Sequence, residues 1–306
     1  MKILITGGSG FLGSRLIQDL SKIQENTQTP QREVIGTYLQ NPHEELLQMD
    51  ITDHDETMMT ILGEMPDMII HTAAAIDVNW CEKHEYDAYR INVDGTRNVA
   101  LAARATGAHL IKISTGYVHD GPVGNYPEAR IPDPRTVYGE TKRLAERVIP
   151  YVLDGRGTWN ILRFDRLYGF NPLKEPGLMR AIREGQEITV YPTQERQPLF
   201  VNDVAHVIES LQETGKNGVV HLGGPERMTM GQLVEGIASL YGREIKIENA
   251  GLDTSSIRPD HVTLDTSLAA SLGIQFTPFQ KALKIMRHEM IKAGKLPEGQ
   301  RRGIER

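Results

Sequence analysis

Short hydrophobic runs alternate with amphipathic stretches through the first half of the chain. The runs are rich in β-branched residues, which is typical of buried strands, and the intervals between them have helical spacing of apolar residues. The expected strands are 2–5, 33–38, 45–49, 68–72, 109–113 and 159–164, and the expected helices are 11–23, 52–63, 82–106 and 136–152. This alternation predicts βαβ units and an α/β fold with a Rossmann-type doubly wound parallel sheet.

The pattern of elements along the sequence changes after residue 169. Prolines separate shorter elements there, and helical patterns recur at 201–214, 230–241 and 279–293. We therefore expect a dinucleotide-binding domain over residues 1–169 and a smaller α/β substrate lobe over residues 170–306, with some later segments returning to the first sheet.

The composition of the chain disfavours several classes of binding partner and site. The 306 residues carry a net charge of −6, which disfavours non-specific binding to nucleic acid or anionic membranes. No apolar run approaches the ~20 residues of a membrane span, and the N-terminus does not look like a signal peptide. The single cysteine, Cys81, excludes an internal disulfide, and no His/Cys cluster has metal-ligand spacing. We expect a cytoplasmic protein without a metal site.

A glycine-rich loop separates the first expected strand from the first expected helix. It satisfies two spacings, Gly7-x-x-Gly10-x-x-Gly13 and Gly8-x-Gly10-x-x-Gly13. Glycines there allow a tight turn, a close approach to a pyrophosphate and close packing of helix on strand, while the helix N-terminus points free N–H groups at the anion. The expected contacts with a dinucleotide are Gly7, Gly10, Phe11, Leu12 and Gly13.

The end of the second strand normally reads the adenosine ribose. An acidic residue there holds the 2′-hydroxyl of NAD, and an arginine suits a 2′-phosphate. Here the residues are Thr37-Tyr38-Leu39-Gln40-Asn41, which are neither acidic nor basic. Since no carboxylate would repel a phosphate, we favour NADP(H) weakly over NAD(H), with Arg15 and Arg32 as candidate sources of positive charge.

Three side chains suggest proton-transfer chemistry. Tyr138 and Lys142 are four residues apart on an expected helix, so they share one face. A nearby ammonium lowers the pKa of a phenol and makes it a better proton shuttle at neutral pH. A hydroxyl at the carboxyl end of the fifth strand can hydrogen-bond a substrate carbonyl, and we choose Thr115 with Ser114 as the alternative.

These motifs, in this order, resemble the extended short-chain dehydrogenase/reductase superfamily, in particular its dTDP-4-dehydrorhamnose reductase branch. The resemblance covers most of the chain and is strongest over the first ~170 residues. Beyond the glycine loop it rests on Asp50-Ile51, His71-Thr-Ala73-Ala74-Ala75, Val78-Asn79-Trp80-Cys81-Glu82, Ile91-Asn92-Val93, Ile113 to Val118, Val137 to Lys142, Leu162-Arg163, Leu167-Tyr168-Gly169, Val201 to Ala205 and Arg258-Pro259.

The resemblance implies a role for each matching residue. Thr115, Tyr138 and Lys142 would be the catalytic triad, with Tyr138 as proton donor, and Asn92 would be a structural helix residue near the site. The substrate would be a nucleotide-linked 4-keto-6-deoxy sugar of the kind used in dTDP-rhamnose biosynthesis. The cofactor would further contact Asp50 and Ile51 at the adenine, and Ala73, Ala74 and Ala75 along its ribose and nicotinamide-side phosphate. Tyr138 and Lys142 are also expected to contact the cofactor, since the lysine can donate to the ribose hydroxyls of the nicotinamide.

Departures from the family pattern fall on the substrate side. Gly116 stands where the family usually has Asp, His119 where an aromatic is usual, and Asp165-Arg166 where a tryptophan of the sugar pocket is typical. They leave the sugar, and whether turnover is changed or lost, open. Plausible diphosphate contacts are Arg196, Gln197 and Arg258, because guanidinium groups suit phosphate oxygens.

Two alternatives to a reductase stay open. One is a nucleotide-sugar epimerase on the same scaffold, and the other is a cofactor-binding regulatory subunit that has lost turnover. A dehydratase is disfavoured, because Gly116 and Tyr117 rather than an acidic pair follow Thr115. The stretches 82–106 and 136–152 could pair in a homodimer.

Overall fold

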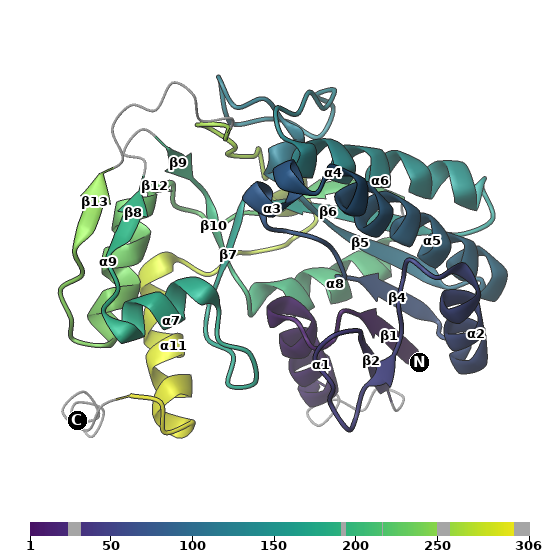
Figure 1. Cartoon of the computed structure of the whole chain (residues 1–306), viewed down its shortest axis with the longest axis horizontal. Coiled ribbons are helices and arrows are strands. Elements are labelled where there is room, and N and C mark those ends of the chain that lie inside the picture. Colours follow the sequence, from purple (N-terminus) through teal and green to yellow (C-terminus); the bar gives the residue numbers. More distant parts are fainter. Residues whose placement is uncertain (24–31, 191–193, 216, 250–257, 297–306) are drawn as a thin grey trace.

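A seven-stranded parallel sheet forms the centre of the molecule (Figure 1). The computed structural model describes residues 1–23, 32–190, 194–215, 217–249 and 258–296. The strands follow the order β11-β6-β5-β4-β1-β2-β3, and this order confirms the doubly wound α/β fold. Their bounds are β1 Lys2–Thr6, β2 Glu33–Tyr38, β3 Leu47–Gln48, β4 Met68–His71, β5 His109–Thr115, β6 Trp159–Phe164 and β11 Gly218–His221.

Helices cover both faces of this sheet. Successive strand residues point to opposite faces, so Ile3 and Ile5 pack into one apolar cluster and Leu4 packs into another. The first cluster is completed by α1 (Phe11–Ile23), α8 (Asp203–Thr214) and α10 (Ser267–Ser271). The second is completed by α2 (His54–Glu64), α5 (Gly95–Thr106) and α6 (Val137–Leu153).

A second lobe lies beside the sheet and has its own core (Figure 1). The paired strands β7 and β10 lie between the sheet and this lobe. Phe279, Met286 and Met290 are buried in the core that joins α7, α9 and α11. The bounds here are β7 Arg166–Tyr168, α7 Gly177–Glu184, β8 Ile188–Val190, β9 Glu195–Arg196, β10 Pro198–Phe200, β12 Met228–Thr229, α9 Met230–Leu240, β13 Ile247–Asn249 and α11 Phe279–Lys292.

The continuous helix expected over 82–106 is wrong. The chain forms α3 (Val78–Lys83), α4 (Glu85–Tyr89), a π-helical turn η2 (Arg90–Asp94) and then α5. The break falls at His84, whose φ of −129° and ψ of 54° are not helical, and whose ring stacks on Trp80. Periodicity alone misses the break, because apolar spacing continues across it.

Other element boundaries differ less. Helix 11–23 and the strands 33–38 and 159–164 are found as expected. The strand expected over 45–49 shrinks to β3 at the sheet edge, where it pairs with β2 alone. By contrast, β5 continues to Thr115, because its residues pair with β6 up to the partner Phe164. The candidate hydroxyls Ser114 and Thr115 therefore belong to the strand itself.

Within these described residues, no helix is both long and apolar enough to cross a membrane. The same residues contain no group of three or more His, Cys, Asp or Glu side chains placed to hold a metal ion. Cys81 is buried and forms no disulfide.

Candidate active site

The glycine loop connects β1 to α1 through a tight turn. Gly7 has a left-handed φ of 70°, and a Cβ on it would lie 2.9 Å from the backbone nitrogen of Ala73. A Cβ on Gly13 would lie 2.3 Å from the carbonyl oxygen of Gly7. The backbone packs too closely at these positions for any residue with a Cβ, so the turn requires glycine.

The first turn of α1 offers donors to an anion. Phe11, Leu12 and Gly13 open this helix, and N–H groups of a first turn have no acceptor within the helix. No acidic residue occupies the turn, and Asn171 fixes it by donating from Nδ2 to the carbonyl oxygen of Phe11 at 2.9 Å. The loop and the helix end therefore fit the pyrophosphate of a dinucleotide.

Asp50 and Ile51 lie beside the end of β2, since the backbone nitrogen of Met49 donates to the carbonyl oxygen of Tyr38 at 2.8 Å. The Asp50 carboxylate accepts from the amide and the hydroxyl of Thr52, both at 2.8 Å. Ile51 is buried. The turn is thus fixed at the edge of the sheet where the adenine side of a dinucleotide is expected.

The two arginines proposed as sources of positive charge are engaged elsewhere. Arg15 donates to Asp19 at 2.7 Å and to Glu289 at 2.7 Å and 3.1 Å. Arg32 pairs with Glu209 at 2.5 Å. Because carboxylates already neutralise both guanidinium groups, neither is available to a 2′-phosphate in this arrangement.

Ala73, Ala74 and Ala75 follow β4 and are partly exposed. The buried Asn92 fixes this segment, because its Oδ1 accepts from the Ala75 nitrogen at 2.8 Å and its Nδ2 donates to the Ala75 carbonyl oxygen at 3.0 Å. The same Nδ2 group donates to the Thr141 hydroxyl at 2.9 Å. Asn92 lies in the π-helical turn and links the alanine segment to α6.

Thr115 and Tyr138 meet at the carboxyl end of β5. The Thr115 hydroxyl oxygen accepts from the Tyr117 amide at 3.2 Å, which leaves its proton for the phenol, and the two side chains are hydrogen-bonded. Burial raises the pKa of Tyr138 above its ordinary value, while the bond from Thr115 acts in the opposite direction. The phenol is therefore protonated at neutral pH and poised as a proton donor.

Lys142 lies one helical turn beyond Tyr138 but does not act on the phenol as expected. Its Nζ donates to the carbonyl oxygen of Ile113 at 2.6 Å. Burial lowers the pKa of Lys142 to about 8, although nearby Glu146 opposes the shift. The expected lowering of the pKa of Tyr138 by Lys142 is absent from this arrangement, because burial of the phenol dominates.

Ser114 serves a different network from Thr115. Its hydroxyl donates to Glu146 at 2.5 Å, and Arg163 donates to both oxygens of the same carboxylate, at 2.9 Å and 2.6 Å. Arg163 also lies 3.3 Å from Nε2 of His221. This chain of buried contacts joins β5, β6, α6 and β11, and it favours Thr115 as the hydroxyl at the reacting centre.

Sequence reasoning missed Glu146, Arg163 and Lys112 as parts of this region. The spacing of Tyr138, Lys142 and Glu146, each four residues apart, was the available signal. Lys112 is 1% exposed, and its Nζ has no hydrogen-bond partner among the described residues. Burial lowers the pKa of Lys112 well below its ordinary value, and the charge of Lys142 acts in the same direction.

Tyr117 connects the reacting centre to the substrate side. Its ring meets that of Tyr138 edge-on, with centroids 5.9 Å apart, and the guanidinium of Arg196 lies 5.8 Å from its centroid. Arg196 also pairs with Asp165 at 3.7 Å, and its buried Nη1 has no hydrogen-bond partner among the described residues. Arg258 donates to the Oδ1 of Asn79 at 2.9 Å.

Gln197 is a structural residue rather than a diphosphate contact. Its Nε2 donates to the carbonyl oxygen of Gly224 at 3.2 Å, and its Oε1 accepts from the Leu264 amide at 2.9 Å. Because both ends of the buried amide are occupied, the proposed phosphate contact is not supported by this geometry.

The departures at Gly116 and His119 have packing explanations. A Cβ on Gly116 would lie 2.7 Å from the carbonyl oxygen of Val262, so an aspartate there would displace the packed 262 segment. His119 is 1% exposed and stacks on Tyr126, with ring centroids 4.4 Å apart. His119 is therefore a core residue that packs as the usual aromatic would.

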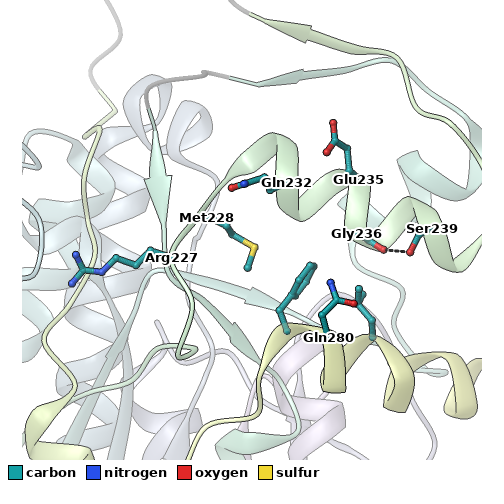
Figure 2. A pocket seen from close by; sticks show the side chains of 9 residues that line it. Arg227, Met228, Gln232, Glu235, Gly236, Ser239 and Gln280 are labelled. Atoms are coloured by element: carbon teal, nitrogen blue, oxygen red, sulfur yellow. Dashed lines mark hydrogen bonds between the residues drawn. The ribbon is translucent and has the colours of Figure 1, made fainter.

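A hollow of about 540 Å³ lies in the C-terminal lobe between α9 and α11 (Figure 2). Figure 2 shows Arg227 directed away from the other labelled side chains. None of the candidate catalytic or cofactor-binding residues lines it; its lining residues are Arg227, Met228, Gln232, Glu235, Gly236, Ser239, Phe279, Gln280 and Leu283.

Comparisons with known proteins place this arrangement in a family. The family described as RmlD substrate binding domain matches residues 1–291. The chain belongs to this family. This match agrees with the family resemblance seen in the sequence.

Two curated relatives with different names are equally similar. Methionine adenosyltransferase 2 subunit beta from Bos taurus is 30% identical over 297 residues, covering 92% of this chain and 86% of the relative. The dTDP-4-dehydrorhamnose reductase of Streptomyces griseus is 30% identical over 283 residues, covering 89% and 88%. A solved dTDP-4-dehydrorhamnose reductase from Bacillus anthracis, in complex with NADP, superposes with a TM-score of 0.79 at 26% identity, covering 94% of this chain and 99% of that one.

Proposed function

We propose that this RmlD-family protein is an NAD(P)H-dependent reductase of a nucleotide-linked 4-keto-6-deoxy sugar. The observation that carries the proposal is the meeting of Thr115, Tyr138 and Lys142 at the carboxyl end of β5, on the same edge of the sheet as the glycine loop that follows β1. Ligands of open α/β sheets bind at this end of the strands. The similarity to a reductase solved with NADP agrees with this choice of cofactor.

The residues divide the work of reducing a ketone. A bound dihydronicotinamide would supply the hydride. Tyr138 donates its proton to the carbonyl oxygen as charge develops there, and the Thr115 hydroxyl stabilises the phenolate that remains, to which it is already hydrogen-bonded. Lys142, whose Nζ donates to the Ile113 carbonyl oxygen, would also donate to the ribose hydroxyls of the nicotinamide.

The cofactor is held by the loop and the alanine segment. Gly7, Gly10, Phe11, Leu12 and Gly13 would bind the pyrophosphate; Asp50 and Ile51 would line the adenine; and Ala73, Ala74 and Ala75 would contact the ribose and the nicotinamide-side phosphate. We favour NADP(H), because Leu39-Gln40-Asn41 at the end of β2 carry no carboxylate to repel a 2′-phosphate. Comparing kcat/KM with NADPH and with NADH tests this preference.

The substrate side fits a diphosphate. Arg196 lies over Tyr117, and its buried Nη1, which faces Asp165 at 3.7 Å, makes no hydrogen bond to the described residues. Arg258 contributes to the same electrostatic cluster. Guanidinium groups suit phosphate oxygens, especially where water is excluded. We propose that Arg196 and Arg258 bind the diphosphate of the nucleotide sugar.

The decisive experiment follows NADPH absorbance while purified protein is incubated with a dTDP-4-keto-6-deoxy sugar. Loss of NADPH matched by formation of the alcohol supports the reductase. Formation of an isomeric sugar without net loss of NADPH would instead assign an epimerase. Tyr138→Phe serves as the control, since it removes the proton donor and keeps the ring.

A second candidate function is favoured by the equal similarity to methionine adenosyltransferase 2 subunit beta. The chain would then bind a nicotinamide cofactor and assemble with a methionine adenosyltransferase without turnover of its own. Co-elution of the two purified proteins, together with equal cofactor binding and equal inertness of wild type and Tyr138→Phe across carbonyl substrates, would support the subunit over the reductase.

A further inference from the structure

His71 lies at the carboxyl edge of the sheet and is hydrogen-bonded at both nitrogen atoms of its ring. It ends β4 and is the register partner of Thr6 at the end of β1. Its Nδ1 lies 2.7 Å from the hydroxyl oxygen of Thr6, and its Nε2 lies 3.1 Å from the hydroxyl oxygen of Thr96 in α5. All three side chains are buried. The ring therefore joins the strand that leads into the glycine loop to a helix that covers the sheet.

The other contacts of the two hydroxyls fix which atoms donate. The Thr96 hydroxyl donates to the carbonyl oxygen of Asn92 at 2.6 Å, so it can only accept from Nε2 of His71. Burial lowers the pKa of His71 well below its ordinary value, and two nearby lysine charges act in the same direction. The ring is therefore neutral at pH 7, with its one proton on Nε2, and its Nδ1 accepts from the Thr6 hydroxyl.

The chain of hydrogen bonds continues from Asn92 to Tyr138. Nδ2 of Asn92 donates to the Thr141 hydroxyl at 2.9 Å, and this hydroxyl donates to the carbonyl oxygen of Tyr138 at 2.8 Å. Each bond from Thr6 onward thus donates toward α6, first through the ring of His71 and then through Asn92. The Nε2 side of the ring supports the helix that carries the proposed proton donor.

The Nδ1 side of the ring supports the proposed cofactor site. The hydroxyl oxygen of Thr6 accepts from the backbone nitrogen of Ala73 at 3.3 Å, and Gly7 follows Thr6 directly. A Cβ on Gly7 would lie 2.9 Å from the same nitrogen, so the glycine loop and the alanine segment are in close contact here. The hydrogen bond to Nδ1 orients the hydroxyl that holds this contact.

We infer that His71 is a positioning residue, whose two ring nitrogens hold the cofactor site and the phenol of Tyr138 in a fixed relation to each other. The inference rests on the proposed function. In that reaction a hydride and a proton reach one carbonyl group from two different donors, so a small error in their relative placement lowers the rate. Because His71 is fully buried, it acts through Thr6 and Thr96.

Two amide substitutions separate the two ends of the ring, because an asparagine amide reaches the position of Nδ1 and a glutamine amide that of Nε2. His71→Asn should keep the bond with Thr6 and lose that with Thr96. We expect it to lower kcat about tenfold and to leave the Kd of NADPH within about twofold. His71→Gln should do the reverse, raising the Kd about tenfold and leaving kcat at saturating NADPH within about twofold. NADPH fluorescence without substrate measures Kd, and NADPH absorbance with the keto sugar measures kcat.

His109→Asn and His109→Gln are the matched controls. His109 is a second histidine whose Nδ1 contacts a threonine hydroxyl, 2.8 Å away at Thr158, but it lies at the amino end of β5. Both controls should keep kcat and Kd within about twofold. Thr96→Val should reproduce the effect of His71→Asn, whereas Thr96→Ser keeps the hydroxyl and should restore the wild-type values. This second pair decides the question if a His71 variant does not fold in a urea melt.

The inference requires the two effects to separate. Equal changes of kcat and Kd in His71→Asn and His71→Gln, or no change in either variant, overturn it, because a histidine with a merely structural role would not divide them. Histidine ¹⁵N NMR adds a readout without turnover: a charged ring, or a proton on Nδ1 instead of Nε2 at pH 7, also overturns it. If wild type reduces no keto sugar, the proposed reductase fails, and the NADPH affinities and the tautomer of His71 alone decide the inference.

Discussion

The two sides of β5 use buried polar groups in opposite ways. At the strand end, Thr115 shares a hydrogen bond with Tyr138, the proposed proton donor. On the opposite side, Lys112 is buried without a partner for its Nζ among the described residues, and Ser114 is locked to Glu146. The strand β5 thus carries the proposed reactive hydroxyl on one side and a fixed cluster of buried polar groups on the other. The comparison predicts that changes on the first side affect turnover, and changes on the second affect stability.

The largest effect is expected on the reactive side. Tyr138→Phe removes the proton donor and keeps a ring that can pack edge-on against Tyr117. We expect kcat to fall by about 10²–10⁴-fold, with cofactor affinity and the unfolding midpoint nearly unchanged. Single-turnover reduction of the keto sugar, with a urea melt in parallel, measures both quantities. Equal rates for wild type and variant would remove the phenol from the mechanism.

Arg163→Met tests the side of β5 on which Ser114 is hydrogen-bonded to Glu146. Among the described residues, this substitution leaves the buried carboxylate of Glu146 with the Ser114 hydroxyl as its one hydrogen-bond partner. Removing one member of a buried ion pair costs about 3–5 kcal/mol of unfolding free energy, which urea titration measures. The double variant Arg163→Met with Glu146→Leu is the control, because it removes both charges and should regain much of the stability. A single variant as stable as wild type would show that the network does not lock the strand.

How well each side could be predicted from sequence follows from the distance along the chain over which its residues interact. The glycine loop and the Tyr138–Lys142 pair are local patterns, so their positions in the fold could be expected from spacing. Arg163 meets Glu146 across 17 residues and His221 across 58, and β11 enters the sheet from the second half of the chain. No local pattern encodes such contacts. The π-helical turn around Asn92 could not be predicted for the same reason, because its Asn92 contacts Ala75 outside the turn.

Acid should lower the unfolding free energy of the chain through two buried histidines. Burial lowers the pKa of His119 and of His221 to about 3, and Arg163 acts in the same direction on both. The unfolded chain, with ordinary histidine pKa values near 6.5, binds more protons than the folded chain between these limits. The unfolding free energy therefore falls as pH drops below about 6.5, by up to about 1.4 kcal/mol per pH unit for each histidine.

Unfolding titrations at a series of pH values test the assignment of this slope. His119→Phe, which can keep the stack on Tyr126, should make the slope shallower by one histidine's share. His206→Gln should leave it unchanged, because His206 is exposed on α8. An unchanged slope in His119→Phe would show that other groups govern the acid response.

The smallest effect is expected at Lys112, and its sign is informative. A buried amine without a hydrogen-bond partner costs about 1–3 kcal/mol, and the lowered pKa of Lys112 means that the unfolded chain gains a proton on this group that the folded chain binds more weakly. Lys112→Met keeps the length of the side chain and removes the polar end, so it should raise the unfolding free energy below about pH 10 by up to this amount. Urea titration at pH 8 measures it, with Lys83→Met at an exposed position as the control. A loss of stability in Lys112→Met would mean that the amine stabilises the network around Glu146.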